Sequence, residues 1–157
     1  MAYDREWCMK SLAISLIGAL LSSCAPAPKP ADPPKPDPTA EPWHAPAVEQ
    51  LASMAREAET AFQAGHTETA AKLVTDGQPL INRLLAAPRP TLAAMEAASD
   101  LDDLYGRMLM ADKRYGWARL QFQKNETRWK HWQPKTPESE RRLKLARDQI
   151  AECDRRL

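Results

Sequence analysis

Nine prolines within residues 25–46 constrain this chain more than any other feature of its sequence. They recur every one to four positions. Proline lacks the amide donor that helices and sheets need, and it disfavours helix in the residue before it. We therefore expect neither helix nor sheet here, but a disordered, polyproline-like tether that reaches at most ~70 Å at about 3.1 Å per residue. The alternative is a ligand for a proline-recognising partner, and no flanking pattern favours it.

An uncharged apolar run precedes the prolines. It covers residues 11–21, and Lys10 stands directly before it. A helix that spans a membrane needs about 20 apolar residues, so this run is too short. A short apolar core behind a positive residue is typical of a secretory signal peptide. The residues that follow at once are Leu21, Ser22, Ser23 and Cys24.

This tetrapeptide resembles the lipobox of bacterial lipoproteins, in which an aliphatic residue and two small residues precede a cysteine. In that family the cysteine is acylated on sulfur and the chain is cut just before it. The resemblance implies a signal peptide over 1–23 and a membrane anchor at Cys24. The alternative, a buried N-terminal helix, leaves Lys10 and the prolines unexplained. Asp4 and Glu6 fit a signal peptide poorly, so we expect the true start at Met9.

The residue after the anchor bears on the destination of the protein. In the enterobacterial pattern, an Asp directly after the lipid-bearing cysteine retains the lipoprotein in the inner membrane. This chain has Ala25 at that position. If the source is a bacterium with two membranes, the resemblance implies an outer-membrane lipoprotein whose body faces the periplasm.

Residues 47–157 have the composition of a helical domain. Ala, Leu, Glu, Arg and Met are abundant, and these residues favour helix, whereas strands favour β-branched and aromatic residues. The β-branched aliphatic residues of this part are Val48, Val74, Ile81 and Ile150. We therefore predict a lipidated cysteine and linker over 24–46 and an all-α domain over 47–157, either a small helical bundle or a set of helical hairpins.

Apolar spacing locates the first two helices. Apolar residues recur every three or four positions over 48–62, which predicts a helix that Gly65 closes. Thr67 or Thr69 opens the second helix. The sequence Asp-Gly-Gln-Pro at 76–79 predicts an interruption of that helix, after which a short helix resumes.

A longer apolar seam follows the break that the prolines at 88 and 90 impose. Its members are Leu101, Leu104, Met108, Ala111, Tyr115, Ala118, Phe122, Asn125, Trp129 and Trp132, always three or four residues apart. This seam fits one helix of about 40 residues, or two helices broken near 112–116. Thr136 and Pro137 predict the start of the last helix.

Small residues in two of these segments resemble parts of the tetratricopeptide repeat, a family of stacked helical hairpins. The first set is Ala58, Gly65 and Ala70, and the second is Gly106, Ala118 and Phe122. The family's closing proline is missing from both sets. Ala58 and Gly106 are also 48 residues apart, whereas the repeat has about 34 residues.

The sequence contains no recognisable catalytic or cofactor site. His44, His66 and His131 have no partner at metal-ligand spacing, and we expect ordinary polar or interface roles for them. Cys153 lies on the apolar stripe of the last helix, so we expect it to be buried. The acidic residues Asp100, Asp102 and Asp103 are interpreted as solvated acids near a helix start. We predict neither an enzyme nor a metal or cofactor site.

Charge and aromatic residues indicate where a partner binds. The chain as a whole has a net charge of +1, which gives no reason to expect nucleic acid, but residues 47–106 carry −5 and residues 107–157 carry +7. Trp117 lies off the apolar seam in the basic half, and Trp, Tyr and Arg are enriched in interface hot spots. The predicted partner-binding residues are Arg114, Trp117, Arg119 and Lys124.

These features favour a non-enzymatic lipoprotein that acts as an interaction or assembly module, held to the membrane by Cys24 and bound to an envelope protein. The alternative is an envelope-binding protein that contacts peptidoglycan or anionic lipid through its basic aromatic face. A third hypothesis is an enzyme whose site is assembled from residues distant in the sequence. For the basic aromatic segment itself, the alternative is that its aromatic residues are core and its charges are the solvated opposite face, which explains the seam but leaves Trp117 unexplained.

Overall fold

The computed structural model describes residues 37–157, and this part of the chain is all-α, as the composition predicts. It contains a 3₁₀ turn and five α-helices: η1 (Pro38–Ala40), α1 (His44–Gln63), α2 (Thr67–Leu85), α3 (Leu92–Ala111), α4 (Tyr115–His131) and α5 (Pro137–Asp154). None of these helices is long and apolar enough to cross a membrane. The predicted signal peptide, the lipobox and the first part of the tether lie outside the described residues.

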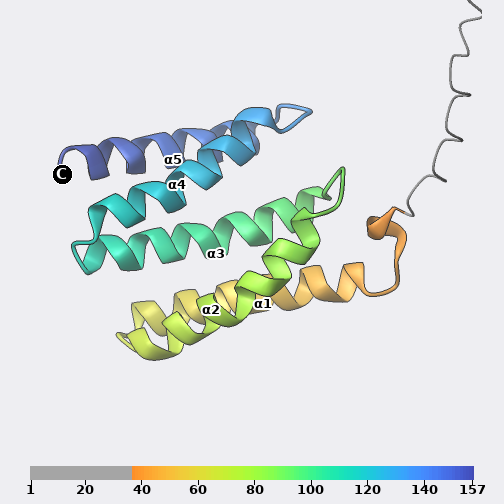
Figure 1. Ribbon diagram of the computed structural model, residues 1–157, viewed down its shortest axis with the longest axis horizontal. Helices are drawn as coiled ribbons and strands as arrows, with labels where there is room; N and C mark the ends of the chain where they lie inside the picture. Colours follow the sequence, from red (N-terminus) through yellow and green to blue (C-terminus); the bar gives the residue numbers. More distant parts are fainter. Residues whose placement is uncertain (1–36) are drawn as a thin grey trace, which may run out of the picture. The chain divides into compact units, whose positions relative to one another are not determined.

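Helices α1, α3 and α5 run in the same direction, and α2 and α4 run back at a tilt (Figure 1). Helix α1 packs directly on both α2 and α3. The chain therefore forms two helical hairpins, α1–α2 and α3–α4, followed by α5 as a single last helix. Both hairpin turns and the C-terminus lie at the same end of the domain (Figure 1). Helix α4 packs between α3 and α5.

The helical domain begins earlier than the predicted boundary at residue 47. Asp37 caps η1 by accepting a hydrogen bond from the Thr39 amide at 2.9 Å, and α1 begins at His44. The expectation that no helix forms among the prolines is therefore wrong at the end of the tether. Pro46 is tolerated because it lies in the first turn of α1, where amides have no intrahelical acceptor.

Trp43 and His44 pack onto the helical body. His44 is buried, and the Arg83 guanidinium of α2 stacks on the Trp43 ring at 3.7 Å from its centroid. These contacts tie the start of α1 to the end of α2.

Helix α2 is continuous, so the predicted interruption at 76–79 is wrong. Pro79 lies inside the helix on its exposed side, where water can satisfy the carbonyl that loses its partner. Gly77 is buried: a Cβ added there would lie 2.3 Å from Leu101 Cδ2. The glycine therefore lets α2 approach α3 closely, and packing overrides the weak helix propensity of this segment.

Two turns of the same geometry close the hairpins. The second turn divides the long apolar seam between two helices, α3 and α4. In the first turn the amides of Gly65 and His66 donate to the carbonyls of Phe62 and Ala61; in the second, Lys113 and Arg114 donate to Met110 and Leu109. Equivalent residues are 48 positions apart. Gly65 has a φ of 80° and Lys113 a φ of 59°. A non-glycine residue at positive φ is uncommon. The sequence therefore could not decide between one long helix and two helices broken near 112–116.

Small residues let the paired helices of the second hairpin approach closely. Gly106 of α3 faces the ring of Phe122 of α4, and an added Cβ would lie 2.4 Å from Phe122 Cε1. Phe122 also contacts Ala118 and Cys153 in one buried cluster. A larger core cluster joins α1, α2 and α3 around Leu51, Leu84 and Leu101.

We predict that Gly106→Ala destabilises the protein by about 1–3 kcal/mol, because the methyl group would overlap a buried aromatic ring. Gly116→Ala is the matched control: its Cβ has only Leu157 nearby, at 4.0 Å. That substitution should raise stability by up to about 1 kcal/mol, since alanine favours helix. Urea unfolding of both variants measures the two changes. Equal effects would show that the contact with Phe122 is not tight.

Candidate functional site on helix α4

The aromatic seam of α4 faces inward, which separates it from the other side of the same helix. Phe122 and Trp129 are buried, while Tyr115 and Trp132 are half-buried. These residues pack as the seam predicts. The inward side of α4 therefore belongs to the core, and a functional surface on this helix has to use the opposite side.

A buried polar network joins the inward side of α4 to α3. The Arg128 guanidinium donates to Asp102 Oδ2 at 2.7 Å and to Asn125 Oδ1 at 2.6 Å. Asn125 donates to the carbonyl of Ser99, and the Trp129 indole donates to the Ser99 hydroxyl. The interpretation of Asp102 as a solvated acid near a helix start is wrong. Its side chain is 1% exposed and lies in the middle of α3.

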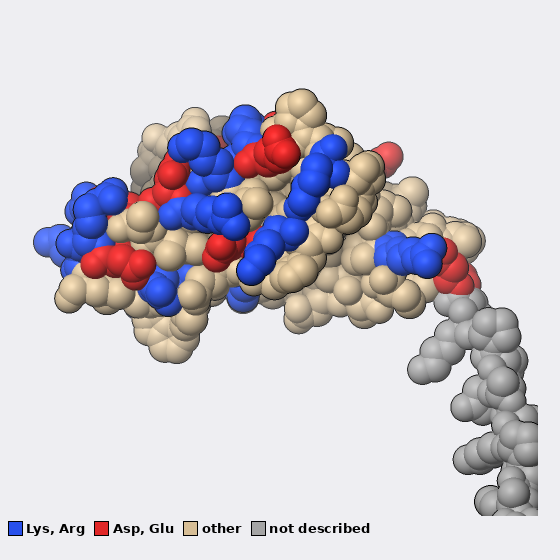
Figure 2. All heavy atoms as spheres, turned by 90° about the horizontal axis from the view of Figure 1, so that it is seen from above, with Lys and Arg blue, Asp and Glu red and all other residues tan. Residues whose placement is uncertain are grey.

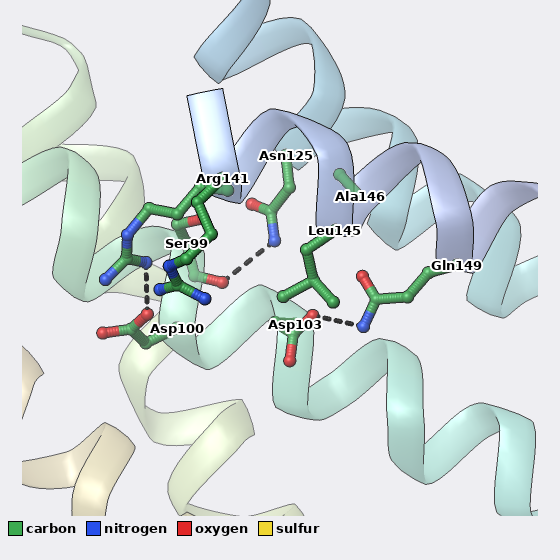
Figure 3. Close-up of a pocket in the computed structure, with 9 residues that line it drawn as sticks. Ser99, Asp100, Asp103, Asn125, Arg141, Leu145, Ala146 and Gln149 are labelled. Carbon is green, nitrogen blue, oxygen red and sulfur yellow. Dashed lines mark hydrogen bonds and ion pairs between the residues drawn. The ribbon is translucent and has the colours of Figure 1, made fainter. Parts of the chain in front are cut away.

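The two neighbouring acids are also paired rather than free. Asp100 accepts from Arg142 of α5 at 2.5 Å, and Asp103 accepts from Gln149 at 2.6 Å and from Arg107 at 2.9 Å. Asp100, Asp103, Arg142 and Gln149 line a small polar hollow between α3, α4 and α5 (Figure 3). Its volume of about 70 Å³ is far below the roughly 300 Å³ of a small-molecule site. The acidic cluster therefore holds helices together.

A wider groove of about 570 Å³ runs between α1 and α3. Arg107 lies in it and pairs with Glu59 of α1 as well as with Asp103. The hydrogen bond from Arg107 lowers the pKa of the Glu59 carboxyl, so this pair stays ionised. Because these polar groups already satisfy one another, the groove presents no convergent set of free functional groups.

The three histidines and Cys153 differ in how far they are exposed, and in the described part of the chain none of them belongs to a group of metal ligands. His66 and His131 are exposed, and His44 is buried. Cys153 is buried as predicted, and this burial raises the pKa of its thiol. Within residues 37–157, no three His, Cys, Asp or Glu side chains are grouped as metal ligands.

The outward side of α4 is the surface that remains. We call it the α4 outer face. It is defined by residues at alternating steps of three and four, which lie on one side of a helix. Arg114 and Lys130 lie at its two margins. The residues in line are Trp117, Leu120, Lys124, Thr127 and His131, and all of them are exposed. Trp117 is 58% exposed and Leu120 is 48% exposed.

Three of the predicted partner-binding residues lie on this face, and the fourth does not. Arg114, Trp117 and Lys124 are exposed together. Arg119 is half-buried, and its guanidinium pairs with Asp154 of α5 at 2.6 Å, so its charge is already engaged. The role of Arg119 in binding a partner stays a prediction, and the sequence gives no sign of its ion pair with Asp154.

The structure adds apolar residues that the sequence analysis missed. Leu120 follows Trp117 by three positions, and that spacing could have identified it. Leu157 is 76% exposed and lies beside Gly116, a contact that no local pattern predicts. Trp117, Leu120 and Leu157 are three of the five large apolar side chains that residues 37–157 expose; the other two are Leu92 and Leu145.

Charge distinguishes the α4 outer face from the neighbouring helix. Seen from above, blue and red side chains lie close together over the surface (Figure 2). The six cations at 141–156 all have acidic partners, and hydrogen bonds from Arg141 and then Arg142 lower the pKa of Glu138 to about 2. Among the described residues, Arg114, Lys124 and Lys130 form no ion pair.

Comparison with known proteins identifies no relative: no family model matches the chain, and no curated protein or solved structure matches it significantly. Function is therefore inferred from the residues of this chain.

We predict that Asp102→Ala destabilises the protein by about 3–5 kcal/mol, because it leaves the Arg128 guanidinium buried without its counter-ion. Asp148→Ala is the control, since Asp148 forms an exposed pair with Lys144 one helical turn away and its loss should cost less than about 0.5 kcal/mol. Urea unfolding of both variants measures the difference. A cost below about 1 kcal/mol for Asp102→Ala would mean that the pair is hydrated and not essential.

Proposed function

We propose that this protein is a non-enzymatic lipoprotein of the bacterial cell envelope that acts as an accessory or assembly module. Cys24 anchors it in the membrane, and the prolines after it hold the helical body at a short distance. In a bacterium with two membranes, the anchor lies in the outer membrane and the body faces the periplasm. The α4 outer face then docks onto another component of the envelope.

The observation that carries this proposal is the combination of exposed apolar and unpaired basic side chains on one side of α4. A tryptophan that is 58% exposed leaves much of its large apolar area in water, where burial against a partner would stabilise it. The inward side of the same helix already packs on α3 and α5. Exposure of Trp117 is therefore not required by the core, and binding is the use that fits its chemistry.

The surroundings of the polar residues favour a binding role over catalysis. The acids and arginines between α1, α3 and α5 are engaged with one another, and the polar hollow of Figure 3 has a volume of only about 70 Å³. A catalytic site needs a positioned acid or base that can reach a substrate. We therefore propose that the protein acts by binding a partner at its surface.

Two classes of envelope component fit this surface. A protein partner is favoured by Trp117, because tryptophan is enriched at the centres of protein interfaces. An anionic component, either peptidoglycan or lipid, is favoured by a different observation, the three cations of this face that have no acidic partner among residues 37–157.

We predict that Cys24 carries the lipid. Replacement of Cys24 by Ala should abolish incorporation of a labelled fatty acid and move the protein from the membrane fraction, because the acyl chains supply its stable attachment. The matched control is Cys153→Ala, which removes the buried thiol and should leave labelling unchanged. A wild-type protein that takes no label and fractionates as soluble would contradict the lipoprotein proposal.

We predict that Trp117→Ala weakens binding of the mature chain, residues 24–157, to isolated envelopes by about tenfold or more, as expected for an interface anchor. The chain carries Cys24→Ala in this experiment, so that acylation does not mask the effect. The melting temperature should hardly change, because Trp117 is exposed. Trp129→Ala is the contrasting variant and should cost about 3–5 kcal/mol of stability, since Trp129 is buried.

Binding that survives Trp117→Ala unchanged would contradict the proposed role of the α4 outer face. Protease treatment of the envelopes beforehand separates the two classes of component. Loss of binding after this treatment identifies a protein, and retention identifies lipid or peptidoglycan.

A further inference from the structure

We infer that the component bound by the α4 outer face is an anionic phospholipid bilayer. This inference deepens the proposed function and rests on it, because it names the partner of the same surface. In this arrangement the body lies on the membrane with α4 parallel to the surface. The lipid anchor and the face of α4 then contact a membrane together.

The charges of the face carry the first step. Arg114, Lys124 and Lys130 are exposed and form no ion pair within residues 37–157, whereas the cations of α5 are neutralised by acids. Glu126 is the only acid of α4, and it faces α5, where it accepts from Arg147 at 3.1 Å. An anionic membrane strengthens binding about fivefold for each Lys or Arg at its surface, so three cations contribute on the order of 100-fold.

The apolar residues carry the second step. Trp117 and Leu120 lie in line with Lys124, and Leu157 joins them beside Gly116 at the N-terminal end of α4. An indole has an apolar body and a polar N–H, and tryptophan is accordingly enriched at the membrane–water boundary. Lysine stems extend along apolar surface while the ammonium stays near the phosphates. The composition of the face is that of an interfacial helix.

The shape of the face agrees with a flat partner. The hollow between α3, α4 and α5 is lined from α4 by the inward residue Asn125, and a further hollow beside Met110 is lined from α4 by the inward residue Phe122. The groove between α1 and α3 has no residue of α4 in its lining. From Trp117 to Lys130 the outer face is a straight helical surface of about 20 Å at 1.5 Å per residue. A bilayer can contact all of it at once without a matching cleft.

The proposed anchor explains why so small a surface is sufficient. One acyl chain combined with a basic patch gives stable membrane attachment where either alone is marginal. A short tether also keeps the second contact at a local concentration in the millimolar range. The α4 outer face then needs little affinity of its own, and its effect is to fix which side of the body faces the lipid.

The test is cosedimentation of the mature chain, residues 24–157 carrying Cys24→Ala, with vesicles of phosphatidylcholine, with and without phosphatidylglycerol. The expected result is binding to the anionic vesicles that is lost at high salt, because the screening length falls from about 10 Å at 0.1 M to about 3 Å at 1 M. Lys124→Gln with Lys130→Gln should weaken it about 25-fold, fivefold for each cation. Trp117→Ala should weaken it as well.

The matched control removes the same charge from α5. Lys144→Gln with Arg147→Gln neutralises two exposed cations that already have acidic partners, and it should change binding less than about threefold. Circular dichroism melts of all the variants should coincide, because every substituted side chain is at least half exposed or lies on the outer side of its helix.

Equal binding to the two kinds of vesicle, equal loss in the α4 and α5 variants, or no binding at all would overturn the lipid inference. If envelope binding that depends on Trp117 is abolished by protease in the same preparations, the inference fails while the proposed function stands with a protein partner. If envelope binding does not depend on Trp117 either, both fail.

Discussion

The buried pair of Asp102 and Arg128 is the interaction around which the second hairpin is organised. Asp102 is 1% exposed, and Arg128 reaches it from α4 across a distance of 2.7 Å. Gln78 of α2 approaches the same carboxylate at 3.5 Å, so one acid joins three helices. A buried charge is costly unless it is paired and hydrogen-bonded, and only one register of α4 against α3 satisfies this condition together with the Asn125 and Trp129 contacts.

That register determines which side of α4 is left outside. With Ala118, Phe122, Asn125 and Trp129 on the side of α4 that faces the core, Leu120 and Lys124 are turned away from it. The α4 outer face is thus a consequence of the polar network on the opposite side, and its apolar residues are not a failure of packing. Substitutions at the network are expected to alter both stability and the surface offered to a partner, whereas substitutions on the outer face alter only the surface.

The two hairpins have similar ends but different interiors. Their turns have the same hydrogen-bond pattern at a spacing of 48 residues, yet the first hairpin closes on apolar contacts and the second on a polar network. Gly77 of α2 and Asn125 of α4 are also 48 residues apart, so they hold equivalent positions inside the first and the second hairpin. The close approach at Gly77 brings α2 against α3 of the next hairpin, whereas Asn125 joins α4 to α3 within its own hairpin. The 48-residue spacing of these two positions differs from the roughly 34-residue period of the tetratricopeptide repeat.

The sequence by itself determined the helical class, the inward seam through Phe122 and Trp129, and the outward position of Trp117, because these follow from propensity and from the three-and-four spacing of apolar residues. The tertiary structure alone decided that α2 continues through Pro79, that Asp102 is buried, that Arg119 pairs with Asp154, and that Leu157 lies beside Gly116 of α4. These outcomes depend on contacts between residues distant in the chain, where close packing and charge pairing outweigh local preference.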